Sequence, residues 1–297
     1  MRAPRGLRTA QLLIAVSALL YGTQGVFAAI AYRHGASVGV LLATRAAIFV
    51  VLALFLLDPV RRATLRGHRG PVLAACATSV IGPALYFAAL QRMDPATVTT
   101  ILFVYPVLTV LAAGALRRVH LTWKALAVTA ATFAGVVCAV GGPGSIDVLG
   151  VVLTLAFACT VAGYFLVAEK GLEGVDPLAW LGITVLAAAV VLIPAGPLLG
   201  GSDLPDATGW AALVAVGLLA GLIASLFQTT GLMRLGSAAT SLVATVEIAT
   251  VVALTWLVLG VRPSAVSLAG AVLIVVGAAL APTAVKRRRA APPTSGA

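Results

Sequence analysis

The sequence predicts an all-α polytopic membrane protein with ten transmembrane helices, arranged as two inverted five-helix repeats. Three observations predict this fold. The chain of 297 residues is 61% hydrophobic and only 10% charged. Uncharged runs of about 20 residues, the length of a helix that crosses the hydrocarbon core, recur from one end to the other. The second half of the chain also resembles the first half at an offset of 142 residues.

Ten spans follow from these runs. Eight of them carry no charged residue: 9–32, 70–91, 95–116, 125–146, 148–168, 177–202, 207–233 and 263–285. A ninth, 35–57, is interrupted by Arg45, and the tenth, 236–262, holds Glu247 inside its apolar stretch. Lipid offers backbone amides no hydrogen-bond partner, so each span is expected to form a helix that closes its own hydrogen bonds.

Basic residues lie at the ends of the spans, as expected where cytoplasmic loops concentrate Lys and Arg. With the N-terminus inside, 16 of the 20 Lys and Arg residues fall on the cytoplasmic side and three on the other. Both termini are then cytoplasmic. The net charge of +11 therefore reflects topology and not nucleic-acid binding. Arg outnumbers Lys 17 to 3 and Asn is absent, a usage typical of GC-rich bacteria, which predicts a bacterial inner membrane.

The first two spans carry polar groups at membrane depth. Tyr21 and Gln24 lie in a glycine-rich patch in the middle of the first span. Gln24 either bonds to a neighbouring helix or lines a pathway. Arg45 lies roughly nine residues into the second span, or ~13 Å deep at 1.5 Å per residue. It either lines a cavity, or it extends toward the headgroups or bonds to helix carbonyls.

Prolines occur in the middle of the third and fourth spans. Pro83 precedes Tyr86, and Pro106 follows Tyr105 directly. A proline removes one helical hydrogen bond. Discontinuous helices form binding sites in many transporters, while other prolines only kink a helix that neighbours support. Both interpretations stay open for Pro83 and Pro106.

The strongest candidate for a functional residue is Glu247. A carboxylate at this depth costs roughly 2.5–3.5 kcal/mol on insertion scales, so such a residue usually faces a protein interior or a wet cavity. Its depth is similar to that of Arg45, which makes a contact between them compatible with the topology. Trp256 follows in the same span, and Gln228 is a weaker cavity candidate in the span before it.

Other residues are expected to serve packing and solvation. Gly135 and Ala139 have the spacing of small residues that favours close helix packing. Glu169 and Lys170 at the end of the sixth span are predicted to be solvated. Residues 286–297 are predicted to form a basic, disordered cytoplasmic tail.

The sequence contains no pattern typical of an enzyme. Cys76, Cys138 and Cys159 each lie in a span and share no metal-ligand spacing. The three histidines fall in loops, and no paired acids within a span and no Gly-rich phosphate loop occur. We therefore predict no enzymatic activity, no metal site and no cofactor.

The repeat divides the chain into residues 1–142 and 145–285. The offset aligns Ala96 with Ala238, Leu90 with Leu232, Arg92 with Arg234 and Gly135 with Gly277, and it places Tyr105 on Glu247 and Tyr86 on Gln228. Each half holds five spans, and because five is odd the second copy enters the membrane from the opposite side. Inverted repeats allow alternating access to a substrate site near the midplane.

With these motifs the chain resembles the EamA family of the drug/metabolite transporter superfamily, over about residues 10–283. The resemblance rests on LLATRAAIFV around Arg45, on FAALQRMDPATVTTILFVYPVLTVL, and on its second-half counterpart LMRLGSAATSLVATVEIATVVALTWLVLG. ALAVTAATFAGVVCAVGG and SLAGAVLIVVGAALAP are similar to the last helix of each repeat. The resemblance implies ten helices in two EamA-like repeats and the transport of a small metabolite, with export as the expected direction.

The chain also departs from the family pattern. Glu247 is followed by Ile248, where the family commonly has Glu-Pro. Arg118-Val119 and Gly260-Val261 stand where a Gly-Glu pair often ends the fourth and ninth helices. Any pairing between helices that relies on those carboxylates is therefore in doubt.

We predict a secondary active transporter of a small metabolite, such as an amino acid or an amphiphilic cationic compound. The expected substrate-binding residues are Tyr21, Gln24, Arg45, Tyr86, Tyr105, Gln228, Glu247 and Trp256. Arg45 is suited to a carboxylate, and Glu247 to an amine or to a coupled proton. The alternative is a membrane scaffold or sensor in which Arg45 and Glu247 only stabilise packing. The expected partners are the substrate, the lipid bilayer and protons, and the oligomeric state is either a monomer or a homodimer.

Overall fold

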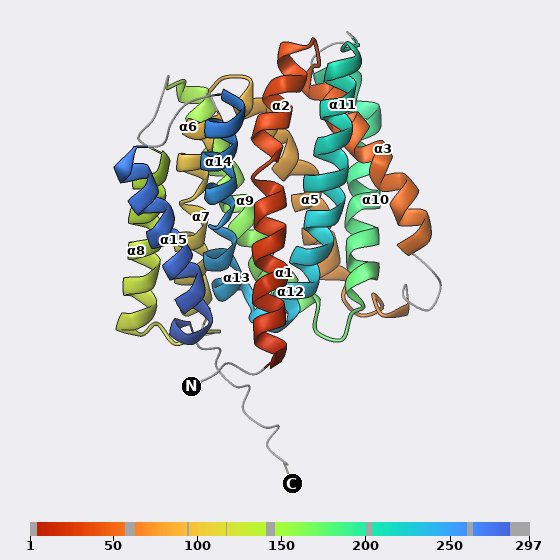
Figure 1. The fold of residues 1–297 in the computed structure, drawn as a ribbon. Helices are drawn as coiled ribbons and strands as arrows, with labels where there is room; N and C mark the ends of the chain where they lie inside the picture. Colours follow the sequence, from red (N-terminus) through yellow and green to blue (C-terminus); the bar gives the residue numbers. More distant parts are fainter. Residues whose placement is uncertain are drawn as a thin grey trace.

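Every regular element in the described part of the chain is a helix (Figure 1). The computed structural model describes residues 5–56, 63–93, 95–116, 118–140, 146–199, 204–259 and 264–285. The predicted tail over 286–297 lies outside these residues. The all-helical fold class predicted from the sequence is confirmed.

The first half of the chain contains α1 (Arg5–Tyr21), α2 (Gln24–Arg33), α3 (Val38–Leu56), α5 (Arg69–Leu90), α6 (Pro95–Leu102), α7 (Tyr105–Ala115) and α8 (Trp123–Val140). The second half contains α9 (Val148–Gly171), α10 (Pro177–Ala195), η1 (Gly196–Leu199), α11 (Ala207–Ala215), η2 (Val216–Ile223), α12 (Ala224–Leu235), α13 (Ser237–Ala244), α14 (Glu247–Leu259) and α15 (Ala265–Ala284). Of these, η1 is a 3₁₀ turn and η2 a π-helical segment that continues directly into α12. Several N-termini are capped by a side chain that accepts a backbone N–H, including those that follow Asp147, Asp176, Asp206 and Ser264.

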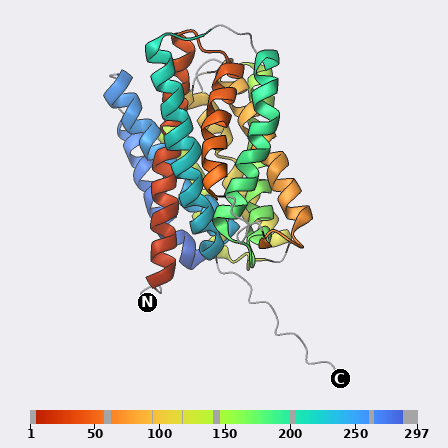
Figure 2. The same cartoon turned by 90° about the vertical axis from the view of Figure 1, so that its right-hand side faces the viewer.

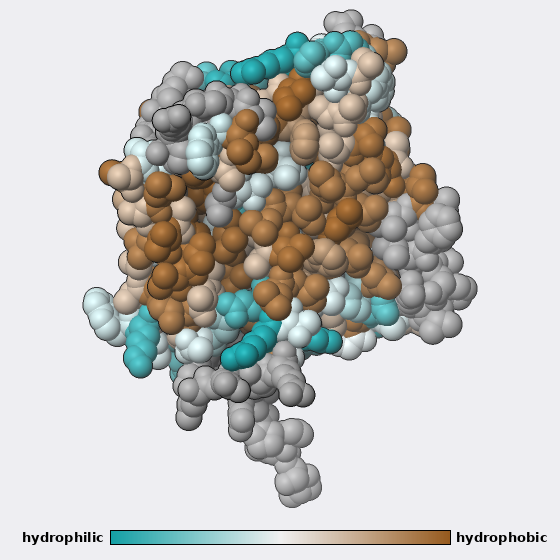
Figure 3. Space-filling view, viewed as in Figure 1, coloured by the Kyte–Doolittle hydropathy of each residue, from teal (hydrophilic) through white to brown (hydrophobic). Residues whose placement is uncertain are grey.

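Seven helices among the described residues are long and apolar enough to cross a membrane. They cover Gly6–Arg33, Arg69–Leu90, Thr97–Ala115, Val148–Gly171, Pro177–Leu198, Ala207–Leu235 and Ala265–Ala284, and two shorter apolar helices cover Val38–Val51 and Trp123–Ala139. Figure 3 shows a broad hydrophobic belt around the middle of the molecule, with hydrophilic residues gathered toward its two ends. This surface matches a protein that is surrounded by lipid.

Three helices break in the middle of the molecule. Residues 22–23 separate α1 from α2, residues 103–104 separate α6 from α7, and residues 245–246 separate α13 from α14. An offset of 142 residues carries Pro95–Leu102 exactly onto Ser237–Ala244, so the repeat is visible in the helix boundaries. Figure 1 shows α6 above α7 but α13 below α14, so the corresponding pairs run in opposite directions.

The prolines have different roles in the two spans that contain them. Pro83 lies inside α5, which continues through it to Leu90. Pro106 follows a break, as the second residue of α7. The equivalent break before Glu247 forms without any proline. Proline is therefore not required for the break. The two breaks lie at equivalent positions of the two repeats, so the repeat explains both of them better than proline does.

Helices from the two halves pack against one another throughout. The closest neighbours are α8 with α15, α3 with α10, α5 with α9, and α1 with α12 (Figures 1 and 2). Between α8 and α15, a Cβ on Gly270 would overlap the backbone of Gly135 and Ala139, and a Cβ on Gly277 would overlap Thr132. The predicted close packing at Gly135 and Ala139 is confirmed.

Both ends of the described chain lie at the same end of the molecule. The start of α1 and the end of α15 are together at the bottom of Figure 1. We call this end the terminal face. One prediction for this face is wrong: Glu169, expected to be solvated, is only 5% exposed. Its partners, described below, explain how a carboxylate can be buried there.

Candidate functional site

The middle of the molecule holds a cavity of about 190 Å³, lined by residues of both halves. Seven of the eight residues predicted from the sequence line it: Tyr21, Gln24, Arg45, Tyr86, Tyr105, Gln228 and Glu247. The helix breaks bring several of them together. Tyr21 ends α1, while Gln24, Tyr105 and Glu247 are the first residues of α2, α7 and α14. Interrupted helices whose broken ends meet at the midplane are the arrangement that transporters use for binding sites.

Arg45 is buried on the cavity wall and is only 9% exposed. Its Nη1 donates a hydrogen bond of 2.8 Å to Oε1 of Gln24. The guanidinium carbon lies 5.5 Å from the ring centre of Phe49 and 5.8 Å from that of Phe87, within the range of cation–π attraction. Its Nε is buried and has no hydrogen-bond partner. A buried donor without a partner is costly, and a ligand acceptor that reached this group would remove that cost.

Glu247 faces the same cavity from the start of α14. No ion pair joins it to Arg45, although the structure describes both side chains. The positive end of the α14 dipole favours a negative charge at this position. The cavity therefore presents a cationic group and an acidic group at separate points, and neither neutralises the other directly.

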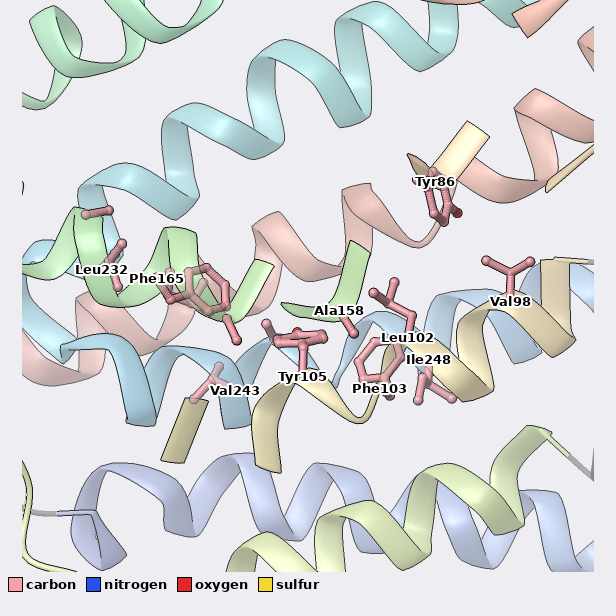
Figure 4. Packing of buried hydrophobic residues seen from close by; sticks show 14 of the residues in the cluster. Tyr86, Val98, Leu102, Phe103, Tyr105, Ala158, Phe165, Leu232, Val243 and Ile248 are labelled. Carbon is pink, nitrogen blue, oxygen red and sulfur yellow. The ribbon is translucent and has the colours of Figure 1, made fainter. Parts of the chain in front are cut away.

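Aromatic rings form much of the remaining wall. The hydroxyl groups of Tyr21 and Ser225 are 2.9 Å apart. The ring of Tyr86 packs against Phe157 with centroids 5.2 Å apart, and the ring of Tyr105 packs against Phe165 at 5.9 Å. Figure 4 shows Tyr105 and Phe165 close together within the buried cluster, with Tyr86 farther away on another helix. These rings offer apolar area to a solute.

Helix α9 contributes a stripe of cavity residues that was not singled out from the sequence. Phe157, Thr160, Val161, Tyr164 and Phe165 all line the cavity. Their spacing of three, four, seven and eight residues from Phe157 places them on one helix face. This periodicity of aromatic and polar residues was the signal that could have identified them. Thr78 and Ser79 on α5 and Thr184 on α10 add hydroxyl groups.

Trp256 does not belong to this cavity. It lies nine residues after Glu247 on α14, or about two and a half turns at 3.6 residues per turn, which places it on the opposite side of the helix. Its side chain is 49% exposed on the outer surface. The structure thus separates Trp256 from the seven residues with which it was grouped.

No cluster of three or more His, Cys, Asp or Glu side chains that could hold a metal ion occurs among the described residues. Beside aliphatic side chains, the cavity is lined by an arginine, a carboxyl, amides, hydroxyls and aromatic rings. Such a set is suited to reversible binding of a small polar or amphiphilic solute.

Two comparisons with known proteins give matches. The family model described as "EamA-like transporter family" matches twice, over residues 8–141 and 148–282. One solved crystal structure has the same fold, with a TM-score of 0.75 and 23% sequence identity over 92% of this chain and 96% of that chain. At this identity the likeness concerns the fold alone. No curated protein matches the sequence.

Proposed function

The chain belongs to the EamA-like transporter family, and we propose that it is a secondary active transporter that exports a small metabolite by alternating access. Family membership makes it a membrane transporter and not an enzyme. The single observation that carries the finer proposal is the midplane cavity, where Arg45 and Glu247 face the same space from different repeats without pairing. A site shared by two repeats can be exposed to either side when the repeats rock against each other.

We further propose ten spans in two inverted repeats, over residues 1–142 and 145–285. The seven long apolar helices, the two shorter ones and the interrupted pair of α13 and α14 together provide ten crossings. The opposite directions of the pairs α6–α7 and α13–α14 support the inversion. The distribution of Lys and Arg supports termini that both lie in the cytoplasm, and the excess of Arg over Lys with the absence of Asn supports a bacterial inner membrane.

The lining of the cavity favours an amphoteric solute such as an amino acid. Arg45, whose Nε has no partner, would donate to a carboxylate, and Glu247 would accept from an ammonium group. The volume of about 190 Å³ lies below the ~300–1,000 Å³ of pockets for drug-sized ligands, which argues for a small metabolite. An amphiphilic cation would use Glu247 and the aromatic rings, leaving Arg45 unused.

Glu247 is also the proposed site of proton coupling. It is the acidic residue that lines the cavity, and it has no cationic partner among the described side chains. In the proposed cycle the carboxyl group binds a proton on one side of the membrane and releases it as substrate binds. Proton and substrate then occupy the site alternately, which couples their movements in opposite directions.

Uptake into inside-out vesicles with an imposed proton gradient tests this proposal. The amide of Glu247→Gln keeps the shape of the side chain but cannot exchange a proton. We expect the variant to lose proton-driven accumulation while retaining exchange of labelled substrate for unlabelled substrate. Glu173→Gln, the same change at an exposed carboxylate, is the matched control and is expected to transport normally. Undiminished proton-driven transport by Glu247→Gln would contradict the coupling role.

The scaffold alternative depends on a contact between Arg45 and Glu247. Arg45 bonds to Gln24 and stacks on two phenylalanine rings, and no ion pair with Glu247 is formed. A residue pair that only stabilised packing would be expected to touch. The observed separation favours the transporter.

A further inference from the structure

A buried ion pair lies at the terminal face, away from the cavity. Nη1 of Arg118 is 3.6 Å from Oε2 of Glu169, and the hydroxyl of Ser237 donates a hydrogen bond of 2.6 Å to the same oxygen. Nη1 of Arg118 also donates to the carbonyl of Leu166. The Glu169 side chain is 4% exposed. We call Arg118, Glu169 and Ser237 the terminal-face cluster.

The cluster lies at the ends of three elements that also line the cavity. On α9, Glu169 follows the cavity residue Phe165 by four residues and therefore shares its helix face. On α13, Ser237 precedes the cavity residue Ala244 by seven residues, or about two turns. Arg118 follows the C-terminal end of α7, whose first residue is the cavity residue Tyr105.

Buried apolar side chains surround Phe165, the cavity residue one turn before Glu169 on α9. Figure 4 shows Phe165 lying between Leu232 of α12 and Val243 of α13, with Tyr105 beside it. Phe165, Leu232 and Val243 are each almost fully buried. A route from the cavity along α9 toward the terminal face would pass Phe165 and then, one turn later, Glu169.

The cluster joins the two repeats and has no charged equivalent at the other face. Arg118 belongs to the first repeat, while Glu169 and Ser237 belong to the second. Moving Glu169 and Ser237 back by 142 residues gives Phe27 and Pro95, which are apolar. The ion pairs described at the opposite face, Arg92 with Asp147 and His34 with Asp206, are formed by side chains at least 38% exposed. Exposed pairs of this kind contribute little to stability, whereas the loss of one partner from a buried pair leaves an uncompensated charge and is costly.

We propose that the terminal-face cluster is the gate that closes the cavity on its cytoplasmic side, and that Arg118 and Glu169 separate when the carrier opens inward. This inference rests on the proposed transport function and topology. Removing one partner of a buried pair leaves the other charge without compensation. The closed gate then loses stability, and the population shifts toward the inward-open state, in which water can reach both residues.

Cysteine labelling tests the gate without knowledge of the substrate. Cys76, Cys138 and Cys159 are replaced by Ala, and Val161→Cys places one thiol on the cavity wall. A membrane-impermeant maleimide is then added to sealed inside-out vesicles. We expect Glu169→Gln and Arg118→Gln each to raise the labelling rate about five-fold or more, because an open state populated at ~0.1–10% has room to grow by this factor. The labelling rate of the double variant should be close to that of each single variant, because either change alone already breaks the same ion pair.

Controls separate the gate from general destabilisation. Glu173→Gln and Arg234→Gln make the same changes at exposed residues of the terminal face and are expected to leave labelling unchanged. In right-side-out vesicles Glu169→Gln is expected to label more slowly than the parent. Ser237→Ala keeps both charges and replaces the charge variants in this test if they do not fold. We expect it to raise the labelling rate less than Glu169→Gln does.

The outcomes distinguish the two proposals. Equal labelling of the parent, Glu169→Gln and Ser237→Ala would overturn the gate, and it would leave the transport proposal standing if the parent protein transports. A parent protein that transports no solute, but whose labelling depends on Glu169, would overturn the transport function and leave the gating contact intact.

Discussion

Gly22, in the break between α1 and α2, packs closely against the start of α14 at Glu247. A Cβ at this position would lie 2.6 Å from the carbonyl oxygen of Glu247 and 2.6 Å from Cβ of Thr250. One of these neighbours belongs to the backbone and cannot rotate away. The missing side chain at Gly22 therefore permits the close approach of α1 to the start of α14.

Gly22→Ala and Gly163→Ala are expected to have opposite effects. Gly22→Ala should destabilise the protein by about 1–3 kcal/mol, the usual cost of overpacking. A Cβ on Gly163, within α9, meets no atom within 4 Å, and Ala favours a helix over Gly by up to ~1 kcal/mol, so Gly163→Ala should be neutral or stabilising. Thermal unfolding in detergent measures both. A Gly22→Ala variant as stable as the parent would contradict the close packing of α1 on α14.

Single residues show where inference from sequence succeeded and where it failed. The cost of burying charge in lipid was enough to identify Arg45 and Glu247 as cavity candidates, and both line the cavity. Trp256 was grouped with them by membership of the same span, without regard to its position around the helix. Glu169 was assigned to solvent because it ends a span, but its environment is set by Arg118 and Ser237, which are distant in the chain. Contacts of this kind cannot be derived from local sequence.

The helix α11 is tied to the end of α2 at the face opposite the terminal face. Asp206 caps α11 by accepting the N–H of Gly209, and its Oδ2 lies 2.7 Å from Nδ1 of His34. The backbone N–H of Asp206 also donates to the carbonyl of His34. The hydrogen bond from Gly209, and then the bond to His34, lower the pKa of Asp206 below its ordinary value of about 3.8.

This lowered pKa predicts a dependence of stability on pH. Because the folded state favours the ionised carboxylate, the stabilisation is fully present above the ordinary pKa of about 3.8 and is lost as the pH falls through the lower pKa of the folded protein. We expect Asp206→Asn to lower the melting temperature at pH 7, and the difference from the parent to shrink below about pH 4. A constant difference from pH 7 to pH 3 would rule out this charge effect. Glu173→Gln is the control at an exposed carboxyl group.

At the level of helices, the sequence predicted which segments form apolar helices better than it predicted where those helices break. Hydropathy identifies a span because burial in lipid acts on the whole segment. The break at residues 245–246 carries no proline or glycine, so no local signal marks it. Its equivalence to the break at residues 103–104 becomes evident only when the repeats are compared.

For the whole molecule, the proposed topology predicts which loops face the cytoplasm. Lys124 at the start of α8 lies on the proposed cytoplasmic side, and Ile146 just before α9 lies on the opposite side. In a cysteine-free background, Ile146→Cys should react with an impermeant maleimide in intact cells. Lys124→Cys should react only after the membrane is permeabilised. The reverse pattern would show that the termini face outward and would place the terminal-face cluster on the outer side.

The glycine contacts between α8 and α15 leave these two helices almost no room to slide past each other. Each helix closes one repeat, so we expect this pair to stay rigid while the angles between the interrupted helices change. Spin labels attached to α8 and α15 should keep a constant separation through the transport cycle. Movements elsewhere in the carrier can then be measured relative to this fixed distance.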